Sequence, residues 1–316
     1  MIYAPASRPT FYFIGVTTGR SSIMNVFPKW AGYLGLGDVV IRGIDLKLHD
    51  DPMSYRDVVS FIKHDPLSVG ALVTTHKLDL YAAAQDLFDE IDPHARLMAE
   101  TSCLSKRDGR LVCHAKDPIS SGLALDGFLP AQHFARTGAE VFSMGAGGST
   151  IALTWHLMRP DRGANRPSRI IVSNRSQARL DHIADIHQAL GTNIPVEYVL
   201  APEAADNDQV LRSLKSGALV VNATGLGKDA PGSPLSDSAL FPEHAIAWEL
   251  NYRGNLIFLD QARSQKHARQ VQVEDGWTYF IHGWTQVIAE VFQIDIPTAG
   301  SRFDEICRIA QDASGR

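Results

Sequence analysis

Strand-like and helix-like segments alternate along this chain, and the alternation limits the folds that it can adopt. Apolar runs typical of buried strands occupy Phe11 to Val16, Val39 to Ile44 and Val69 to Thr74. Segments with helical periodicity, Ser22 to Leu34 and Ser54 to Lys63, lie between them. Strands joined by helices predict a mostly parallel sheet, so we expect an α/β domain in the first part of the chain.

The pattern changes beyond this first series. Two helical segments, Leu78 to Phe88 and Pro93 to Ala99, precede two short β-like runs, Ser102 to Lys106 and Leu111 to Ala115. A turn sequence, Arg107-Asp108-Gly109, lies between the two runs and predicts a β-hairpin.

A second α/β series begins near Glu140. The sequence VFSMGAGGST places a short apolar run directly before glycines and a helical pattern, Ile151 to Met158. The helical segments Tyr279 to Phe292 and Arg302 to Asp312 follow this series, and we expect them to return and cover the first domain. The series predicts a doubly wound sheet with further strands at Arg169 to Ser173, Pro195 to Leu200, Ala218 to Asn222 and Ala245 to Leu250.

Length, charge and cysteine content limit the possible functions. A chain of 316 residues favours two domains, and a net charge of -5 without a basic cluster argues against nucleic acid as a partner. The cysteines, Cys103, Cys113 and Cys307, match neither a disulfide framework nor a zinc site, so we predict a reducing compartment and no metal.

The chain shows no sign of a membrane segment. No apolar run approaches the roughly 20 residues that cross a bilayer, and the start MIYAPASRPT lacks the pattern of a signal peptide. We therefore expect a cytoplasmic protein that does not contact a membrane.

The glycine turn is a candidate cofactor site. Gly145, Ala146, Gly147 and Gly148 follow a strand and open a helix, where missing side chains let the backbone approach a pyrophosphate at the helix N-terminus. Thr150 stands where the third glycine of the G-x-G-x-x-G pattern is expected. By spacing alone a purely structural turn is about as good an interpretation, and the strand and helix around the turn favour the cofactor.

The end of the next strand indicates which dinucleotide binds. An NAD enzyme is expected to place Asp or Glu here for the ribose 2′-hydroxyl, whereas this chain has the sequence NRSQAR, Asn174 to Arg179. Arg175 and Arg179 suit a 2′-phosphate because guanidinium groups are permanently charged and match its oxygens. Alternatively, the two arginines lie one turn apart on a solvated helix face.

Seven motifs are spread over nearly the whole chain: TTHK (74 to 77), ETSCLSKRDGRLVCHAKD (100 to 117), GAGGST (145 to 150), NRSQAR (174 to 179), NATGLG (222 to 227), ELNY (249 to 252) and GWTQVIAEVF (283 to 292). They occur in the order found in the shikimate and quinate dehydrogenases, and the chain resembles that family over nearly its whole length.

The resemblance implies both fold and activity. It implies an N-terminal α/β substrate domain, residues 1–118 with 280–316, and a Rossmann-type doubly wound NADP-binding domain, residues 119–279, with the substrate in the cleft between them. The implied reaction is NADP(H)-dependent interconversion of a ring hydroxyl and a ketone on a shikimate-like or quinate-like carbocycle. In the family reaction, NADPH reduces 3-dehydroshikimate to shikimate.

The resemblance also implies roles for individual residues. Lys77 and Asp117 correspond to the family's catalytic lysine and aspartate. The chemistry agrees with this, because an ammonium can stabilise the charge that develops on a ketone oxygen and supply its proton. Without the resemblance, Lys77 reads as a surface lysine and Asp117 as a helix N-cap. The implied substrate-binding residues are Ser21, Ser22, Thr74, Thr101, Tyr252 and Gln286. The implied cofactor-binding residues are Gly145, Ala146, Gly147, Gly148, Asn174, Arg175, Ser176, Arg179, Asn222, Thr224 and Gly225.

The chain departs from the family pattern around the substrate. Leu72 and Thr101 align with asparagines of the family, and the lysine loop is one residue short, so that His76 directly precedes Lys77. Each buried hydrogen bond that is lost costs roughly 1 to 3 kcal/mol, so the pocket is expected to prefer a different ligand. Arg20 or Lys116 is a candidate anchor for a substrate carboxylate.

These departures leave alternatives open. His76 and His114 are candidates for a proton relay or for structural hydrogen bonding. The same chemistry on another polyol, cyclitol or aminoshikimate-type substrate is one alternative function, and a non-catalytic regulator that senses quinate or shikimate is another. The protein is expected to be a monomer or a homodimer.

Overall fold

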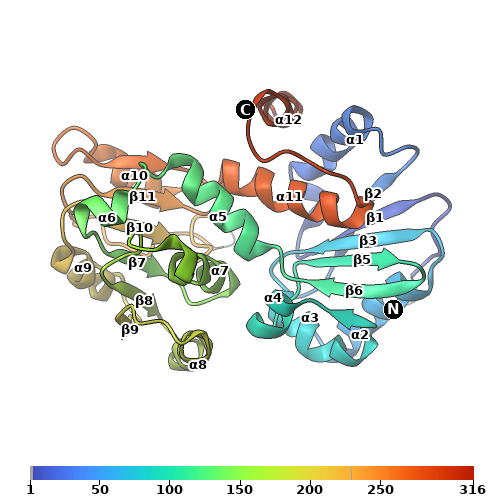
Figure 1. The fold of residues 1–316 in the computed structure, drawn as a ribbon, viewed down its shortest axis with the longest axis horizontal. Helices are drawn as coiled ribbons and strands as arrows, with labels where there is room; N and C mark the ends of the chain where they lie inside the picture. The colour runs from blue at the N-terminus through green and yellow to red at the C-terminus, as the bar shows by residue number, and fades with distance from the viewer. Residues whose placement is uncertain (1–2, 229) are drawn as a thin grey trace. The chain divides into compact units, whose positions relative to one another are not determined.

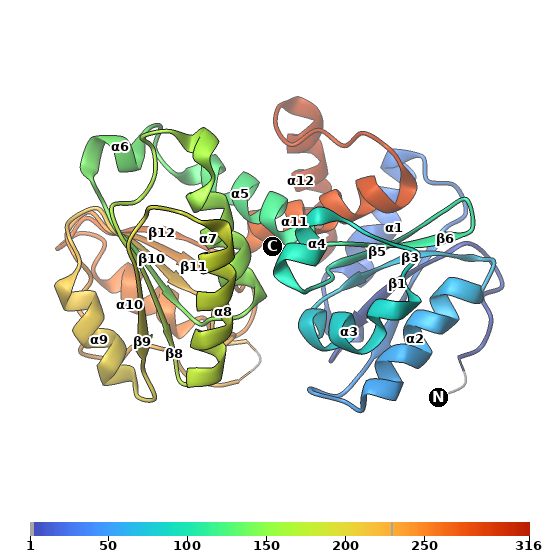
Figure 2. The same ribbon diagram turned by 60° about the horizontal axis from the view of Figure 1, so that its bottom comes forward.

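The computed structural model describes residues 3–228 and 230–316, and the chain divides into two compact units (Figures 1 and 2). Unit 1 comprises Met1–Asp117 with Ile281–Arg316, and unit 2 comprises Pro118–Phe280. The C-terminal segment Ile281–Arg316 therefore belongs to the same unit as the first part of the chain.

The sheet of unit 1 has the strand order β2-β1-β3-β5-β6-β4. β1 pairs in parallel with β2 and β3, which confirms the predicted βαβαβ arrangement. β5 is antiparallel to β3 and to β6, and β4, which the sequence analysis missed, is parallel to β6. The strands are β1 (Thr10–Gly15), β2 (Val40–Asp45), β3 (Ser68–Val73), β4 (Glu90–Ile91), β5 (Cys103–Arg107) and β6 (Arg110–His114).

The predicted hairpin is confirmed between β5 and β6. Arg107 is opposite Arg110, and the two residues between them have φ angles of 49° (Asp108) and 76° (Gly109). A two-residue hairpin turn favours positive φ at both positions, and an Asp-Gly pair meets this requirement at low cost.

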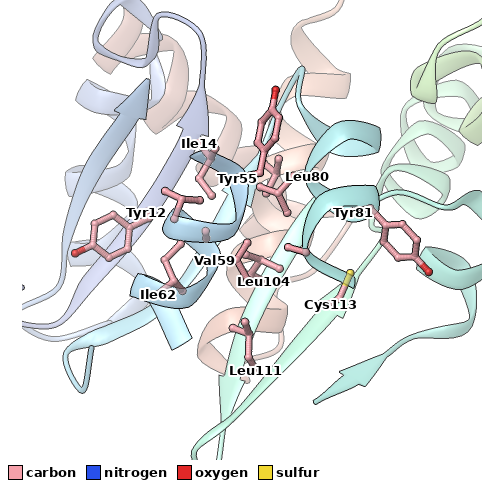
Figure 3. Close-up of a cluster of buried hydrophobic side chains, with 14 of the residues drawn as sticks. Tyr12, Ile14, Tyr55, Val59, Ile62, Leu80, Tyr81, Leu104, Leu111 and Cys113 are labelled. Atoms are coloured by element: carbon pink, nitrogen blue, oxygen red, sulfur yellow. The ribbon is translucent and has the colours of Figure 1, made fainter. Parts of the chain in front are cut away.

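Helices cover both faces of this sheet, because side chains of β1 point alternately to either side. Tyr12 and Ile14 lie in a buried cluster with side chains of α2 and α3 (Figure 3), whereas Phe11 packs on Phe27 of α1 and Trp284 of α11. The helices of unit 1 are α1 (Ile23–Leu34), α2 (Pro52–His64), α3 (Lys77–Ala84), α4 (Pro93–Met98) and α12 (Ser301–Ser314), with η1 (Thr18–Arg20), η2 (Gln85–Leu87) and most of α11 (Trp277–Phe292).

One predicted helix is shorter than expected. The segment Leu78 to Phe88 was expected to be one helix, but α3 ends at Ala84 and the 3-10 turn η2 follows it. Ala84 has φ −123° and ψ 12°, which breaks the α-helical geometry.

The sheet of unit 2 has the order β12-β11-β10-β7-β8-β9, and every pairing is parallel. The chain starts at the centre with β7, winds outward through β9, returns to β10 and winds outward again, which is the Rossmann-type doubly wound order. The predicted doubly wound sheet is confirmed. Its strands are β7 (Val141–Met144), β8 (Ile170–Asn174), β9 (Val196–Leu200), β10 (Leu219–Asn222), β11 (Ile246–Glu249) and β12 (Gln272–Glu274).

Both faces of the second sheet are also covered. Phe142 of β7 shares a buried cluster with Leu211 of α9 and Phe258 of α10, while Trp248 of β11 packs on Phe128 of α5 at 5.1 Å between ring centroids. The helices of unit 2 are α5 (Asp117–Phe128), α6 (His133–Thr137), α7 (Gly148–Met158), α8 (Gln177–Leu190), α9 (Ala204–Ser213) and α10 (Ile257–Ser264), with η3 (Pro160–Arg162). In the part of the chain that the structure describes, no helix is long and apolar enough to cross a membrane.

Candidate active site

Lys77 is held at the start of a helix by a strained turn. It is the first residue of α3. A hydrogen bond from the amide of Thr74 to the carbonyl of Ile14, at 3.0 Å, anchors the turn between β3 and α3. Thr75 has φ 55°, in the left-handed region that β-branched residues rarely occupy. Strain of this kind persists only where the surrounding structure holds it, and it is common next to functional groups.

The ammonium of Lys77 donates a hydrogen bond to the carboxylate of Asp117, the first residue of α5. The two side chains are only 16% and 10% exposed. Burial lowers the pKa of Lys77, but the carboxylates of Asp117 and Glu100 outweigh it and the net direction is upward. The structure therefore brings together the two residues predicted to be catalytic.

A third ionisable group, which the sequence analysis did not single out, lies beside this pair. Glu100 is 0% exposed, and burial raises its pKa to about 7 although the charge of Lys77 opposes the shift. Its neighbour Thr101 donates its amide to the carbonyl of Lys77 at 3.2 Å, so the backbone segments of the two charged residues are joined.

The neighbouring histidines have partners in the fold. His76 is 1% exposed, its Nδ1 is hydrogen-bonded to the Tyr55 hydroxyl at 3.2 Å, and burial lowers its pKa. His114 is hydrogen-bonded to Ser105 at 2.8 Å and lies 3.3 Å from Asp92. Burial lowers the pKa of His114 as well. These contacts favour structural roles for both histidines.

The other predicted substrate residues of unit 1 occupy different settings. The Thr101 hydroxyl donates within the hairpin, to the carbonyls of Cys103 at 3.2 Å and His114 at 3.4 Å. Ser21 is buried next to η1, and Ser22 is the N-cap residue of α1. Gln286 is half-buried on α11.

The candidate anchors for a carboxylate also differ. The ammonium of Lys116 pairs with the carboxylate of Glu290 on α11, which also pairs with Arg107. This cluster ties the hairpin to α11 and occupies the lysine. Arg20 is exposed at the end of η1.

In unit 2, the glycine turn directly follows β7, one of the two central strands. Gly145 has φ 105°, and a Cβ atom there would lie 2.6 Å from the carbonyl oxygen of Ala223. Glycine is therefore required where the loop after β7 passes the loop after β10. At Gly147 a Cβ would meet nothing within 4 Å, so the N-terminal end of α7 is open on that side.

Thr150, at the position where the G-x-G-x-x-G pattern has its third glycine, has a structural role. Its hydroxyl donates to the carbonyl of Gly145 at 2.6 Å and contacts the Ser143 hydroxyl at 2.9 Å. Ala146 is buried and Gly148 opens α7. The carboxyl ends of β7 and β10 are the switch point of the sheet, where doubly wound proteins bind nucleotides.

The loop after β10 is tied to a buried glutamate. The amide and hydroxyl of Thr224 donate to the Asn222 side chain at 3.1 and 2.7 Å, and Asn222 in turn donates to the Glu249 carboxylate at 2.6 Å. Gly225 has φ 77° and continues the turn. The loop is thus held in one conformation next to the glycine turn.

The predicted phosphate-binding residues follow β8. The amide of Ser176 donates to the Asn174 side chain at 2.9 Å, which shapes the turn into α8. Arg175 is exposed and Arg179 is half-buried, and among the described residues neither has an acidic partner within ion-pair distance. Two guanidinium groups at the end of this strand suit a phosphate.

Tyr252, the remaining predicted substrate residue, belongs to unit 2. Its ring packs on Phe280 at 4.5 Å and on Trp277 at 5.5 Å between centroids. Lys77, Gln286 and the loop at Ser21 belong to unit 1.

The fold and the site define an α/β protein with a Rossmann-type unit and a separate unit that carries a buried Lys-Asp pair. The chain is 26% identical over 189 residues to the shikimate dehydrogenase (NADP(+)) of Lactococcus lactis subsp. cremoris, covering 60% of this chain and 61% of that protein. It is 26% identical over 289 residues to the shikimate dehydrogenase (NADP(+)) of Methylocella silvestris, covering 91% of each chain.

The solved structures give the same result for the fold. The quinate dehydrogenase of Corynebacterium glutamicum, solved in complex with NAD, superposes with a TM-score of 0.72 at 20% identity over 96% of this chain and 98% of that chain. No family model matches the chain. The chain is related in sequence to the shikimate dehydrogenases and has the fold of the shikimate and quinate dehydrogenases, which confirms the predicted resemblance.

Proposed function

We propose that this protein is an NADP(H)-dependent oxidoreductase that interconverts a hydroxyl and a ketone on a shikimate-like or quinate-like carbocycle. The observation that carries the proposal is the buried pair of Lys77 and Asp117. The relatives named shikimate dehydrogenase support the substrate class, although the first of them is matched over 61% of its length.

The chemistry follows from the charges of this pair. NADP(H) supplies or takes up the hydride when it is bound. In the reducing direction Lys77 stabilises the negative charge that develops on the ketone oxygen and gives it a proton, and in the oxidising direction it takes the hydroxyl proton. Asp117 holds the ammonium in place, since a charge-assisted hydrogen bond fixes its direction.

The dinucleotide fits the residues of unit 2. The turn Gly145 to Gly148 would hold the pyrophosphate at the N-terminus of α7, and Arg175, Ser176 and Arg179 would hold the 2′-phosphate beside Asn174. Asn222, Thr224 and Gly225 would line the nicotinamide. The name NADP(+) of the curated relatives supports this choice, while the quinate dehydrogenase was solved with NAD.

We assign substrate contacts to Ser21, Ser22, Thr74, Thr101, Tyr252 and Gln286. The Thr101 hydroxyl donates within the hairpin, so a ligand would have to use its acceptor lone pairs. A cytoplasmic location, the state of monomer or homodimer and the roles of the two domains stay predictions.

The proposal is tested by NADP⁺ reduction, followed at the nicotinamide absorbance, with purified protein and a panel of shikimate, quinate and other ring polyols. NAD⁺ is run in parallel. Turnover of shikimate or quinate with NADP⁺ supports the proposal. Tight NADPH binding without turnover of either acid overturns the substrate assignment and directs the search to cyclitols, amino-substituted rings or a sensing role.

A further inference from the structure

We propose that Glu100 is a positioning residue for the proton chemistry of Lys77. Its buried carboxyl group sets the net charge around the Lys77-Asp117 pair and thereby how tightly Lys77 holds its proton. The inference rests on the proposed function, because it assigns a residue to the same lysine.

The first observation concerns the hydrogen bonding of the Glu100 carboxyl group. The side chain is 0% exposed, and neither carboxyl oxygen has a hydrogen-bond partner among the described residues. Large majorities of buried polar groups are hydrogen-bonded, because an unpaired one costs free energy. A buried carboxyl group without such partners therefore needs another explanation.

The second observation is that the backbone fixes Glu100 firmly. Ala99, directly before it, is in the left-handed region with φ 48°, and ends α4. The amide of Glu100 donates to the carbonyl of Ala95, and the amide of Thr101 donates to the carbonyl of Lys77, each at 3.2 Å. These two hydrogen bonds, directly after the left-handed residue Ala99, hold the backbone of Glu100 in place inside unit 1.

The third observation is the set of charges that Glu100 faces. Lys77 at the start of α3 and Asp117 at the start of α5 interact with it electrostatically. Cys113 of β6 also faces it, but burial raises the pKa of that thiol to about 12, so the thiol is neutral. Lys77 is the single cation among these groups, and it is shared by two carboxyl groups.

The charge state of Glu100 therefore affects Lys77 directly. With Glu100 ionised, two carboxylates surround one ammonium and the proton is held more tightly. With Glu100 protonated, only Asp117 opposes proton loss. In alcohol oxidation the carbon gives a hydride to NADP⁺, the hydroxyl proton passes to the Lys77 amine, and the C–O bond becomes C=O. An ionised Glu100 favours the ammonium that this step forms.

The test uses the reciprocity of electrostatic coupling, since Lys77 must shift Glu100 as much as Glu100 shifts Lys77. The full chain is labelled with ¹³C at the glutamate carboxyl carbon, and the Glu100 resonance is assigned by its loss in Glu100→Gln. We expect a midpoint near neutral pH in the wild type. In Lys77→Met we expect a midpoint about one pH unit higher, a tenfold change in the ionisation constant.

Glu249, buried in unit 2, is the matched control, and its midpoint is expected to be unchanged in Lys77→Met. A Glu100 midpoint at its ordinary value, or the same midpoint with and without Lys77, overturns the inference. This readout needs no turnover, so it stands apart from a failure of the proposed activity.

A kinetic measurement completes the test. The pH profile of kcat for alcohol oxidation is expected to move to lower pH by about one unit in Glu100→Gln, with KM for NADP⁺ unchanged. A purely structural role would instead lower activity equally at every pH. An unshifted profile in an active, folded Glu100→Gln protein contradicts the inference.

Discussion

Two buried glutamates, one in each unit, differ in how their carboxyl groups are satisfied. Both Glu100 and Glu249 are 0% exposed, and burial raises the pKa of each to about 7. Glu249 accepts hydrogen bonds from the Asn222 side chain at 2.6 Å and from the Asn251 amide and side chain at 2.8 and 2.6 Å. Glu100 accepts none from the described residues and faces Lys77 and Asp117 instead.

The difference teaches that burial alone does not identify a functional carboxylate. The burial of the Glu249 carboxylate is accounted for by its hydrogen bonds to the loops that it joins, next to the glycine turn. The buried carboxyl group of Glu100 has only the charges around it as partners among the described residues. Substitutions of Lys77, Asp117 and Glu100, which we call the unit 1 cluster, should therefore change proton chemistry. Substitutions around the unit 2 loops should change dinucleotide affinity.

Among substitutions of the residues around Lys77, the largest effect is expected for Asp117→Asn. The substitution removes the counter-ion that orients Lys77 but keeps a polar side chain at the start of α5, so kcat should fall by roughly 10² to 10³. NADPH affinity, measured by titration of nucleotide fluorescence, should stay within about twofold. A drop in NADPH affinity with little change in kcat would break the division of roles between the units.

The stability of Glu100→Gln should exceed that of the wild type at high pH. The pKa of Glu100 is about 7 in the folded protein, against an ordinary value of 4.5 that applies to the unfolded chain. Between these pH values the folded state binds more protons than the unfolded state. The wild type therefore loses stability as pH rises through this window. At pH 8 the variant should gain on the order of 2 kcal/mol in the free energy of unfolding, and at pH 4.5 almost nothing.

Urea denaturation at the two pH values measures this difference. Glu243, which is exposed in unit 2, provides the control Glu243→Gln, for which we expect no change at either pH. Equal stability of Glu100→Gln and the wild type at pH 8 would mean that the carboxyl group carries no buried charge.

Arg175→Ala and Arg179→Ala should each weaken NADPH binding by about tenfold, the loss of one charge-assisted contact to a phosphate. NADH binding should hardly change, because NADH has no 2′-phosphate. Arg212→Ala, in the last turn of α9 and exposed, is the matched control. Equal losses for both nucleotides would remove these arginines from 2′-phosphate recognition.

The smallest effect is expected for Glu249→Gln. The substitution replaces one carboxylate oxygen of Glu249, which accepts a hydrogen bond from Asn222, by an amide nitrogen. The loop at Thr224 is then held less firmly, and the Kd for NADPH should rise by about threefold to fivefold. At saturating NADPH, kcat should stay near that of the wild type. A lowered kcat with unchanged Kd would place Glu249 with Glu100 and erase the contrast between them.

The sequence was sufficient to predict the elements with strong local signals. The central parallel strands β1, β3, β7 and β10 are buried, largely apolar runs, and the Asp108-Gly109 turn specifies its hairpin by local φ preferences. The two missed strands, β4 and β12, are two and three residues long, without fully buried positions, and they leave no periodic pattern.

The site was predictable only in part. Lys77 and Asp117 were found through the order of family motifs, and the structure joins them across 40 positions. Glu100 was overlooked because its burial depends on Ala99, a non-glycine residue in a left-handed conformation, and on the backbone contact of Thr101 with Lys77. Neither signal is visible in local sequence patterns. A glutamate two residues before a strand-like run was the available hint.

The most direct test of the central claim is NADP⁺ reduction by Lys77→Met on the substrate that the wild type turns over best, with NADPH binding measured on the same samples. We predict a loss of kcat of about 10³ or more, with NADPH affinity within about twofold of the wild type. Turnover of Lys77→Met within about threefold of the wild type would contradict the assignment of the proton chemistry to the unit 1 cluster.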